Sequence, residues 1–119
     1  MIVRRRDAAT PFTTKDGSTI RSLLDRTNAP VRNQSLAEAT IPPGGATQPH
    51  HHALTEEFYC VVEGSGRMRV GEEERDVRVG DAILIPPGTV HTLRNTGTGP
   101  LRILCCCAPP YDHDDTYLA

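Results

Sequence analysis

The sequence has no tryptophan and only two phenylalanines and three tyrosines in 119 residues. It also lacks any apolar run approaching the roughly 20 residues of a membrane-spanning helix. The basic run Arg4–Arg6 is followed by Asp7–Pro11 rather than by an apolar segment, so it does not begin a secretory signal. These absences predict a soluble, cytoplasmic protein without a membrane partner.

An excess of charge of one sign is also missing, since 13 Lys and Arg face 15 Asp and Glu for a net charge of −2. Apart from one arginine run the basic residues are scattered, so the basic patch of a nucleic-acid-binding protein is absent. Nucleic acid is therefore not an expected partner.

The sequence also lacks a favourable placement of cysteines for a disulfide, although it has four of them. Cys105, Cys106 and Cys107 are consecutive, and neighbours on a strand point to opposite faces, which is poor geometry for pairing. We expect free, reduced thiols in a mostly buried strand, as suits a cytosolic compartment. One thiol facing a pocket, with a catalytic or metal-binding role, is the alternative.

Glycine and proline are abundant, at ten residues each, and they divide a chain of single-domain length into short segments. Seven β-rich runs without intervening amphipathic helices predict an all-β sandwich or barrel. The one helical pattern is Ile20, Leu23 and Leu24 after Ser18 and Thr19, which predicts one or two turns of helix. The predicted strands are Gln34–Ile41, Glu57–Val62, Gly66–Val70, Arg75–Val79, Asp81–Ile85, Val90–Asn95 and Leu101–Cys107.

The predicted strands define three regions of the chain. Residues 1–33 are expected to be an N-terminal arm that packs on the barrel or on a partner subunit, and residues 34–108 the barrel itself. Residues 109–119 form a tail with two prolines and the charged run Asp112–Asp115, which predicts an irregular surface segment.

Two histidines near the middle of the chain have the spacing of metal ligands. On an extended strand His50 and His52 project to the same face, while His51 points the other way. Glu57 opens an alternating run in which it shares a face with Tyr59. If the chain folds Glu57 back beside the histidines, two imidazoles and a carboxylate can hold a divalent transition metal with positions left open.

A second segment, Gly80–Asn95, has a tight turn at Pro86–Gly88 between two apolar strands, and His91 begins the return. Together the two segments resemble the two signature motifs of the cupin superfamily, and the resemblance covers about half of the chain. The first motif is matched by Gly44, His50, His52, Glu57 and Gly64. The second is matched by Gly80, Pro86, Gly88, His91 and Asn95.

The resemblance implies a jelly-roll barrel in which His50, His52, Glu57 and His91 bind one divalent metal. Known cupins use iron, manganese, zinc, nickel or copper at such a site, and nitrogen and oxygen ligands do not choose among these. Small cupins commonly form dimers, so we expect a homodimer in which the arm packs on the neighbouring barrel.

Other residues near the motifs have two interpretations. Tyr59 is either a catalytic residue that contacts the substrate or a core tyrosine. His51, Glu56 and the hairpin tip Glu72–Glu74 are expected at the surface. Five apolar residues of the predicted strands form either the wall of a pocket or the hydrophobic core. They are Met68, Val70, Leu84, Leu93 and Ile103.

A cupin fold does not fix function. The full ligand set favours a metalloenzyme that acts on a small organic molecule, with oxidative, dioxygenase-like chemistry preferred. A sugar or sugar-phosphate isomerase or epimerase is the first alternative, but Arg67 and Arg69 are expected to face solvent, which weakens a phosphate clamp. A non-catalytic small-molecule sensor is the second alternative.

Overall fold

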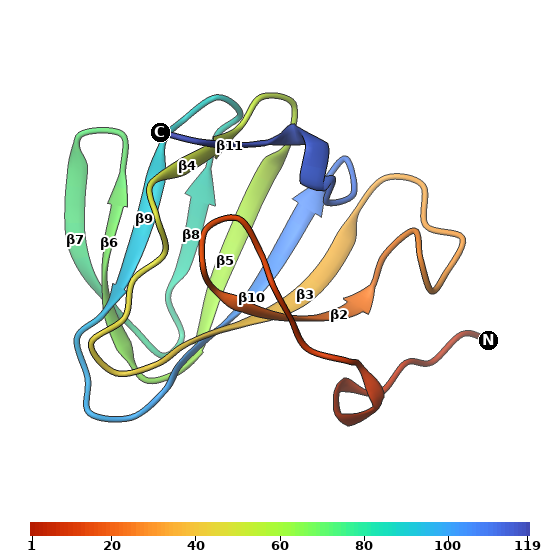
Figure 1. Ribbon diagram of the computed structural model, residues 1–119, viewed down its shortest axis with the longest axis horizontal. Helices are drawn as coiled ribbons and strands as arrows, with labels where there is room; N and C mark the ends of the chain where they lie inside the picture. Colours follow the sequence, from red (N-terminus) through yellow and green to blue (C-terminus); the bar gives the residue numbers. More distant parts are fainter.

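The computed structural model describes all 119 residues and consists of two antiparallel sheets packed face to face as a jelly-roll sandwich (Figure 1). The larger sheet has the order β1-β2-β3-β10-β5-β8, and the smaller has the order β11-β4-β9-β6-β7. No helix has the length and apolar character needed to cross a bilayer. The all-β prediction is confirmed.

The first six strands are β1 (Phe12–Thr13), β2 (Thr19–Leu24), β3 (Ser35–Ile41), β4 (His50–His52), β5 (Glu56–Glu63) and β6 (Ser65–Val70). The others are β7 (Glu73–Arg78), β8 (Ala82–Ile85), β9 (His91–Asn95), β10 (Leu101–Ala108) and β11 (Thr116–Leu118). Two single 3-10 turns, η1 (Arg6–Ala8) and η2 (His113–Asp115), are the only helical elements. All seven predicted strands are present, and the largest boundary difference is at β7, which begins at Glu73 rather than Arg75.

The predicted helical turn around Ile20 is wrong, because this segment is strand β2 and pairs antiparallel with β3. Three apolar residues are too few to stabilise a short isolated helix. Pairing with β3 instead satisfies the backbone, and Ile20 packs against the core. Residues 12–24 of the expected arm therefore add two strands to this chain's own larger sheet (Figure 1).

The expected irregular tail is also corrected, because its last residues form β11 along the free edge of β4. On one side β4 pairs with β9 at a single position, His50 with His91. Its opposite edge would leave backbone groups unpaired, and β11 covers that edge. Asp115 and Thr116, which precede and begin β11, are buried. The tail is thus part of the sandwich near the histidine strand.

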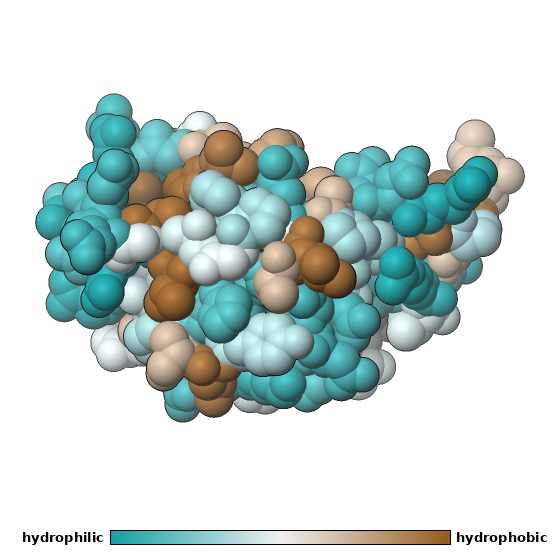
Figure 2. Space-filling model, turned by 90° about the horizontal axis from the view of Figure 1, so that it is seen from above, coloured by the Kyte–Doolittle hydropathy of each residue, from teal (hydrophilic) through white to brown (hydrophobic).

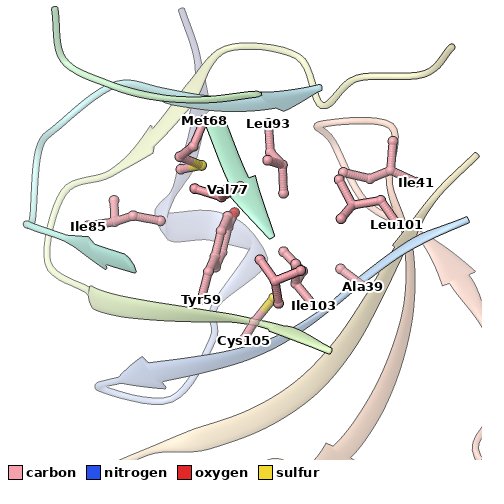
Figure 3. Packing of buried hydrophobic residues seen from close by; sticks show 11 residues of the cluster. Ala39, Ile41, Tyr59, Met68, Val77, Ile85, Leu93, Leu101, Ile103 and Cys105 are labelled. Atoms are coloured by element: carbon pink, nitrogen blue, oxygen red, sulfur yellow. The ribbon is translucent and has the colours of Figure 1, made fainter. Parts of the chain in front are cut away.

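The core lies between the two sheets and consists of eleven buried residues (Figure 3). Met68, Leu93 and Ile103 are among them, as predicted for pocket wall or core, and Val70 packs against them. Leu84 is not, because it projects from the outer face of β8 and is 53% exposed. Figure 2, which views the end of the sandwich near β11, shows hydrophobic patches separated by hydrophilic residues.

Candidate metal centre

Three histidines meet inside the sandwich on strands β4 and β9. His50 and His52 are buried on the inner face of β4, while His51 is half-buried on the outer face and stacks on Tyr117. The predicted face assignment is therefore confirmed. His91 begins β9, as predicted, and the ligand atoms of the three buried histidines all lie within 4.8 Å of one another.

The turn at Pro86–Gly88 brings His91 to this position. Gly88 has φ +76°, which glycine adopts readily, and its N–H donates to the His52 carbonyl over 2.6 Å. Asn95 closes the far end of β9, since its side chain accepts from Gly97 N and donates to the Ile41 and Gly99 carbonyls. Asn95 therefore stabilises the turn that follows β9.

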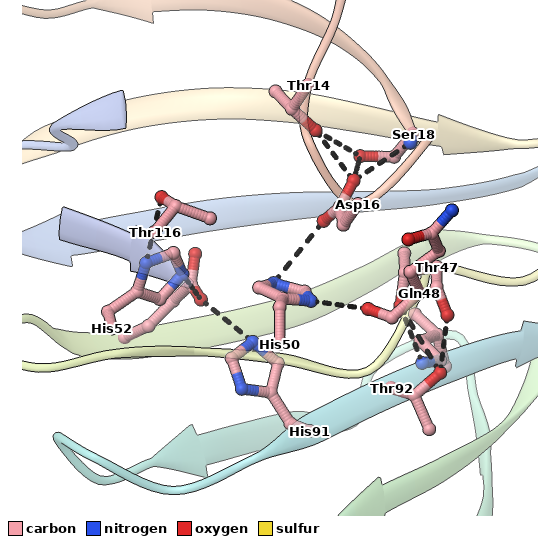
Figure 4. A network of polar contacts seen from close by, with 12 residues as sticks. Thr14, Asp16, Ser18, Thr47, Gln48, His50, His52, His91, Thr92 and Thr116 are labelled. Carbon is pink, nitrogen blue, oxygen red and sulfur yellow. Dashed lines mark hydrogen bonds and ion pairs between the residues drawn. The ribbon is translucent and has the colours of Figure 1, made fainter. Parts of the chain in front are cut away.

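Each histidine is oriented by a backbone carbonyl at its Nδ1 atom, and Figure 4 shows the contact of His50 with Gln48. His50 Nδ1 lies 2.7 Å from Gln48 O, and His91 Nδ1 lies 3.1 Å from Thr89 O. His52 Nδ1 lies 3.3 Å from the carbonyl oxygen of Asp115. A carbonyl only accepts, so Nδ1 bears the proton in all three rings. In each neutral ring the lone pair is therefore on Nε2, the atom that faces the centre of the site.

Glu57, on the inner face of β5, directs one carboxylate oxygen at these lone pairs. Its Oε1 atom lies 3.4 Å from His52 Nε2 and 3.5 Å from His91 Nε2. Oε1 and His91 Nε2 are buried without a hydrogen-bond partner. Its other oxygen, Oε2, accepts from the Cys107 thiol over 3.1 Å.

Buried acceptor atoms that face one another need a proton or a cation between them. Imidazole rings held in place by backbone carbonyls, together with a carboxylate, form a donor set that suits a divalent transition metal. The three buried histidines could thus hold a metal ion, and the orphaned atoms around them fit one.

The charge states of two of these groups suit metal binding. Burial opposes ionisation of Glu57, but its contacts with His52 and His91 lower the pKa of this carboxyl to about 2. Burial, and then the nearby His91, lower the pKa of His50, which favours the neutral ring. Burial acts against the proton on His52, but Glu57 outweighs it and raises the pKa of that ring, so a metal ion has to displace a proton there. The carboxylate of Glu57 and the neutral ring of His50 are the forms that bind metals.

The structure adds an acidic residue that the sequence did not indicate, Asp16 from the loop between β1 and β2. Its Oδ2 atom lies 3.3 Å from His50 Nε2, and the side chain is buried (Figure 4). The sequence signal was an aspartate before a glycine, which marks a turn but gives no direction for the carboxylate.

The C-terminal segment was also missed. Besides the Asp115 carbonyl, the Thr116 hydroxyl lies 3.2 Å from His52 Nδ1. The Asp115 carboxylate accepts from Ala53 N, Leu54 N and the Thr55 hydroxyl, which ties the segment to the chain beyond β4. These contacts join residues about 60 positions apart in the sequence, so no local pattern predicts them.

A pocket bordered by β2, β3 and β10 reaches His50, His52 and Glu57. Tyr59 lies on its wall, and its ring centre is 5.9 Å from that of His91. Burial raises the pKa of Tyr59 well above its ordinary value, so its phenol keeps its proton. The lining residues include no lysine or arginine, and several are apolar, such as Phe12, Ile20 and Ile103.

The remaining sequence predictions concern the cysteines and arginines. All four cysteines are free, and Cys105 and Cys107 line the pocket, so the alternative of a thiol facing it is confirmed in position. Burial raises the pKa of Cys107, which remains a thiol and donates to Glu57. Arg67 and Arg69 lie outside the pocket on β6, where Arg67 pairs with Asp76.

The Cupin domain family model matches residues 37–107, which is more than half of the chain, and the chain belongs to this family. The uncharacterized protein MJ1618 of Methanocaldococcus jannaschii is 48% identical over 110 residues, covering 92% of this chain and 88% of its own length. Protein SchB of Streptomyces halstedii is 29% identical and covers 83% and 72%.

Solved structures have the same fold. The polyketide cyclase RemF of Streptomyces resistomycificus has a TM-score of 0.76 at 27% identity, covering 91% of this chain and 79% of its own. A predicted oxalate decarboxylase of Thermotoga maritima has a TM-score of 0.78 at 23% identity, covering 91% and 98%. The second likeness, at this identity, shows the fold alone.

Proposed function

We propose that this cupin is a metal-dependent enzyme in which His50, His52, Glu57 and His91 hold one divalent transition metal. The observation that supports it is the set of buried acceptor atoms, with Nε2 lone pairs facing Glu57 Oε1 at 3.4–3.5 Å. When bound, an iron, manganese, zinc, nickel or copper ion supplies an open position that polarises or activates an oxygen-bearing molecule.

The pocket beside the site indicates the substrate class. Because no lysine or arginine lines it, a phosphorylated sugar would lack the usual charged partner for its phosphate there. Of the 21 residues that line it, 10 are hydrophobic, and this mixed lining suits a small, uncharged, ring-containing molecule with adjacent oxygens, such as a catechol, a flavonol or a diketone. The likeness to the polyketide cyclase RemF supports an organic substrate of this oxygen-rich kind.

Tyr59 is the proposed catalytic residue of the chain. Its protonated phenol lies on the pocket wall near His91, so it donates a hydrogen bond to a substrate oxygen there. Glu57 remains ionised and is oriented by the Cys107 thiol, which keeps Oε1 directed at the histidines. Dioxygenase-like chemistry on such a substrate is the activity we favour.

The test is turnover by metal-reconstituted protein. We expect oxygen consumption with a catechol, flavonol or diketone, lost in His91→Ala and kept in the matched surface variant His51→Ala. Conversion without oxygen consumption would overturn the dioxygenase proposal but keep the enzyme. Isomerisation of a sugar from a parallel panel would favour the isomerase alternative, and tight binding without conversion a sensor.

We also propose a homodimer. On the outer face of the larger sheet Cys106, Phe58 and Leu84 are cross-strand neighbours, and Phe58 is 52% exposed. The N-terminal residues 1–11 expose Ile2 and Val3, which suits packing on a neighbouring barrel. Light scattering should give a dimer for the full chain and less dimer after removal of residues 1–11. A monomeric full chain would contradict it.

A further inference from the structure

Asp16 is held so that only one of its carboxylate oxygens is free to bind. Its Oδ1 atom accepts from the Thr14 hydroxyl at 2.6 Å, from Ser18 N at 2.8 Å and from the Ser18 hydroxyl at 2.6 Å. These three donors fix the side chain and leave Oδ2 directed at His50 Nε2, 3.3 Å away (Figure 4). Asp16 is 8% exposed and lines the pocket that reaches His50.

The contact between Asp16 and His50 joins two acceptors. Because His50 Nδ1 donates to the Gln48 carbonyl, its Nε2 atom holds a lone pair in the neutral ring. Two ligands at 2.0–2.1 Å from one metal ion lie about 2.8–3.4 Å apart when they are neighbours in octahedral or tetrahedral geometry. The 3.3 Å separation of Asp16 Oδ2 from His50 Nε2 falls within this range.

Glu57 is built in the same way on the other side of the site. One of its oxygens accepts from the Cys107 thiol, and the other faces Nε2 atoms of His52 and His91 at 3.4 and 3.5 Å. Hydrogen bonding of one oxygen and a free second oxygen are typical of carboxylates that bind metals. Asp16 therefore repeats, against His50, the arrangement of the carboxylate in the proposed ligand set.

Hydrogen bonds to two other segments of the chain hold the loop that bears Asp16. The Asp16 carbonyl accepts from Gln48 N over 2.7 Å, just before β4. Lys15 Nζ donates to the carbonyls of His113 and Thr116, both at 3.0 Å, which links the loop to the C-terminal segment. Gly17, with φ +89°, allows the turn that places Asp16 inward.

We propose that Asp16 is a fifth protein ligand of the metal, supplied by the N-terminal segment in addition to His50, His52, Glu57 and His91. The proposal rests on the metal site proposed above. A six-coordinate ion held by five protein groups keeps one position for water or for a single substrate oxygen. A substrate that binds through two oxygens must then displace Asp16.

The test uses Mn²⁺ alone with the full-length chain and the variant Asp16→Asn. The amide keeps an acceptor oxygen for Thr14 and Ser18 but replaces the ligating oxygen with NH₂, so the loop is preserved while the ligand is lost. Asp25→Asn is the matched control, because Asp25 is a hydrogen-bonded aspartate of the same segment without a histidine contact.

We expect Asp16→Asn to weaken Mn²⁺ binding by about tenfold or more and Asp25→Asn to leave it unchanged. Loss of a nearby group that does not touch the metal also weakens binding by such a factor, so affinity alone does not decide. The enhancement of water proton relaxation by bound Mn²⁺ does decide, because it reports the waters on the ion. We expect one additional bound water in Asp16→Asn.

Weaker binding with an unchanged number of bound waters would make Asp16 a positioning residue and overturn the proposal. Unchanged affinity in Asp16→Asn would overturn it as well, while the four-residue site would stand. His91→Ala tests that site separately, since it should lose Mn²⁺ whatever Asp16 does. A wild-type chain that binds neither Mn²⁺ nor iron, zinc, nickel or copper ions would contradict both proposals, and circular dichroism of Asp16→Asn confirms that the variant is folded.

Discussion

His50 and His52 are two residues apart on one strand, yet different parts of the chain surround them. At His50, Nδ1 bonds to Gln48 just before the strand, and Nε2 faces Asp16 from the N-terminal segment. At His52, Nδ1 bonds to Asp115 from the C-terminal segment, and Nε2 faces Glu57 from β5. The pKa of His50 is lowered by burial, whereas Glu57 raises that of His52 against burial.

The strands therefore position the histidines, whereas the two ends of the chain supply groups that contact their rings, Asp16 at His50 and Asp115 at His52. The His52 side depends on a segment more than 60 residues away, while the His50 side combines a local carbonyl with the N-terminal loop. The two sides should therefore respond differently to substitutions in the two terminal segments.

The largest effect is expected at His91, which lies 3.5 Å from Glu57 and beside both histidines of β4. His91→Ala removes an inward Nε2 atom, so metal affinity should fall by about a hundredfold or more when measured by competition with a chelator. His51→Ala, on the outer face of the same strand as His50, should retain the metal. Equal losses in the two variants would refute the face assignment.

The second largest effect is expected among the residues that surround His52. Asp115→Ala leaves the backbone N–H groups of Ala53 and Leu54 without their acceptor, so the free energy of unfolding should fall by about 1–3 kcal/mol in urea denaturation. Metal affinity should fall about tenfold because the Asp115 carbonyl loses its fixed position beside His52. A loss of stability with full metal affinity would show that the C-terminal segment does not orient His52.

A smaller change on the same side is Thr116→Val. It removes the hydroxyl that lies 3.2 Å from His52 Nδ1 but leaves the Asp115 carbonyl to hold the ring. Because the hydroxyl also donates to the Asp112 carbonyl, we expect a loss of roughly 0.5–1.5 kcal/mol in stability for each of these two hydrogen bonds, and a few-fold loss in metal affinity. If Thr116→Val lowered metal affinity as much as His91→Ala does, the Thr116 hydroxyl rather than the Asp115 carbonyl would fix the tautomer of His52.

The smallest effect is expected at Asp25, on the His50 side but away from the histidines. Burial opposes its ionisation, but hydrogen bonds from Ser22 and Thr27 lower its pKa below the ordinary 3.8. A depressed pKa stabilises the fold above the unfolded value, and that stability is lost as pH falls through the folded pKa. Asp25→Asn should therefore cost less than about 1 kcal/mol at pH 7, since solvent screens the charge of this half-buried group.

Thermal unfolding at pH 7 and in acid well below the lowered pKa of Asp25 measures this prediction. The difference between Asp25→Asn and the wild-type chain should be present at pH 7 and disappear in that acid, where both carry a neutral side chain. A difference that persists there would assign the effect to the turn itself rather than to the charge.

The contrast between the strands that bear the histidines and the terminal segments around them also explains how much of the site could be predicted from the sequence. His50, His52, Glu57 and His91 stand at motif spacing, and their strands show clear alternation, so the strands and the inward faces follow from local pattern. Tyr59 was placed on the correct face by the same argument.

The terminal segments could not be predicted in this way. Three apolar residues in β2 fit a helix as well as a strand, and only pairing with β3 decides between them. Asp16 meets His50 across 34 positions of sequence, and Asp115 meets His52 across 63. Such contacts depend on the closed sandwich, so neither residue has a local signal.

The central claim is that the facing buried acceptors hold one divalent metal ion per chain. Elemental analysis of wild-type protein purified without oxygen and without chelators tests it most directly, with the metal expressed per mole of chain. We predict close to one transition-metal ion per chain and its removal by a strong chelator. Protein that contains no metal, and takes up none from iron, manganese, zinc, nickel or copper salts while folded, would contradict the account.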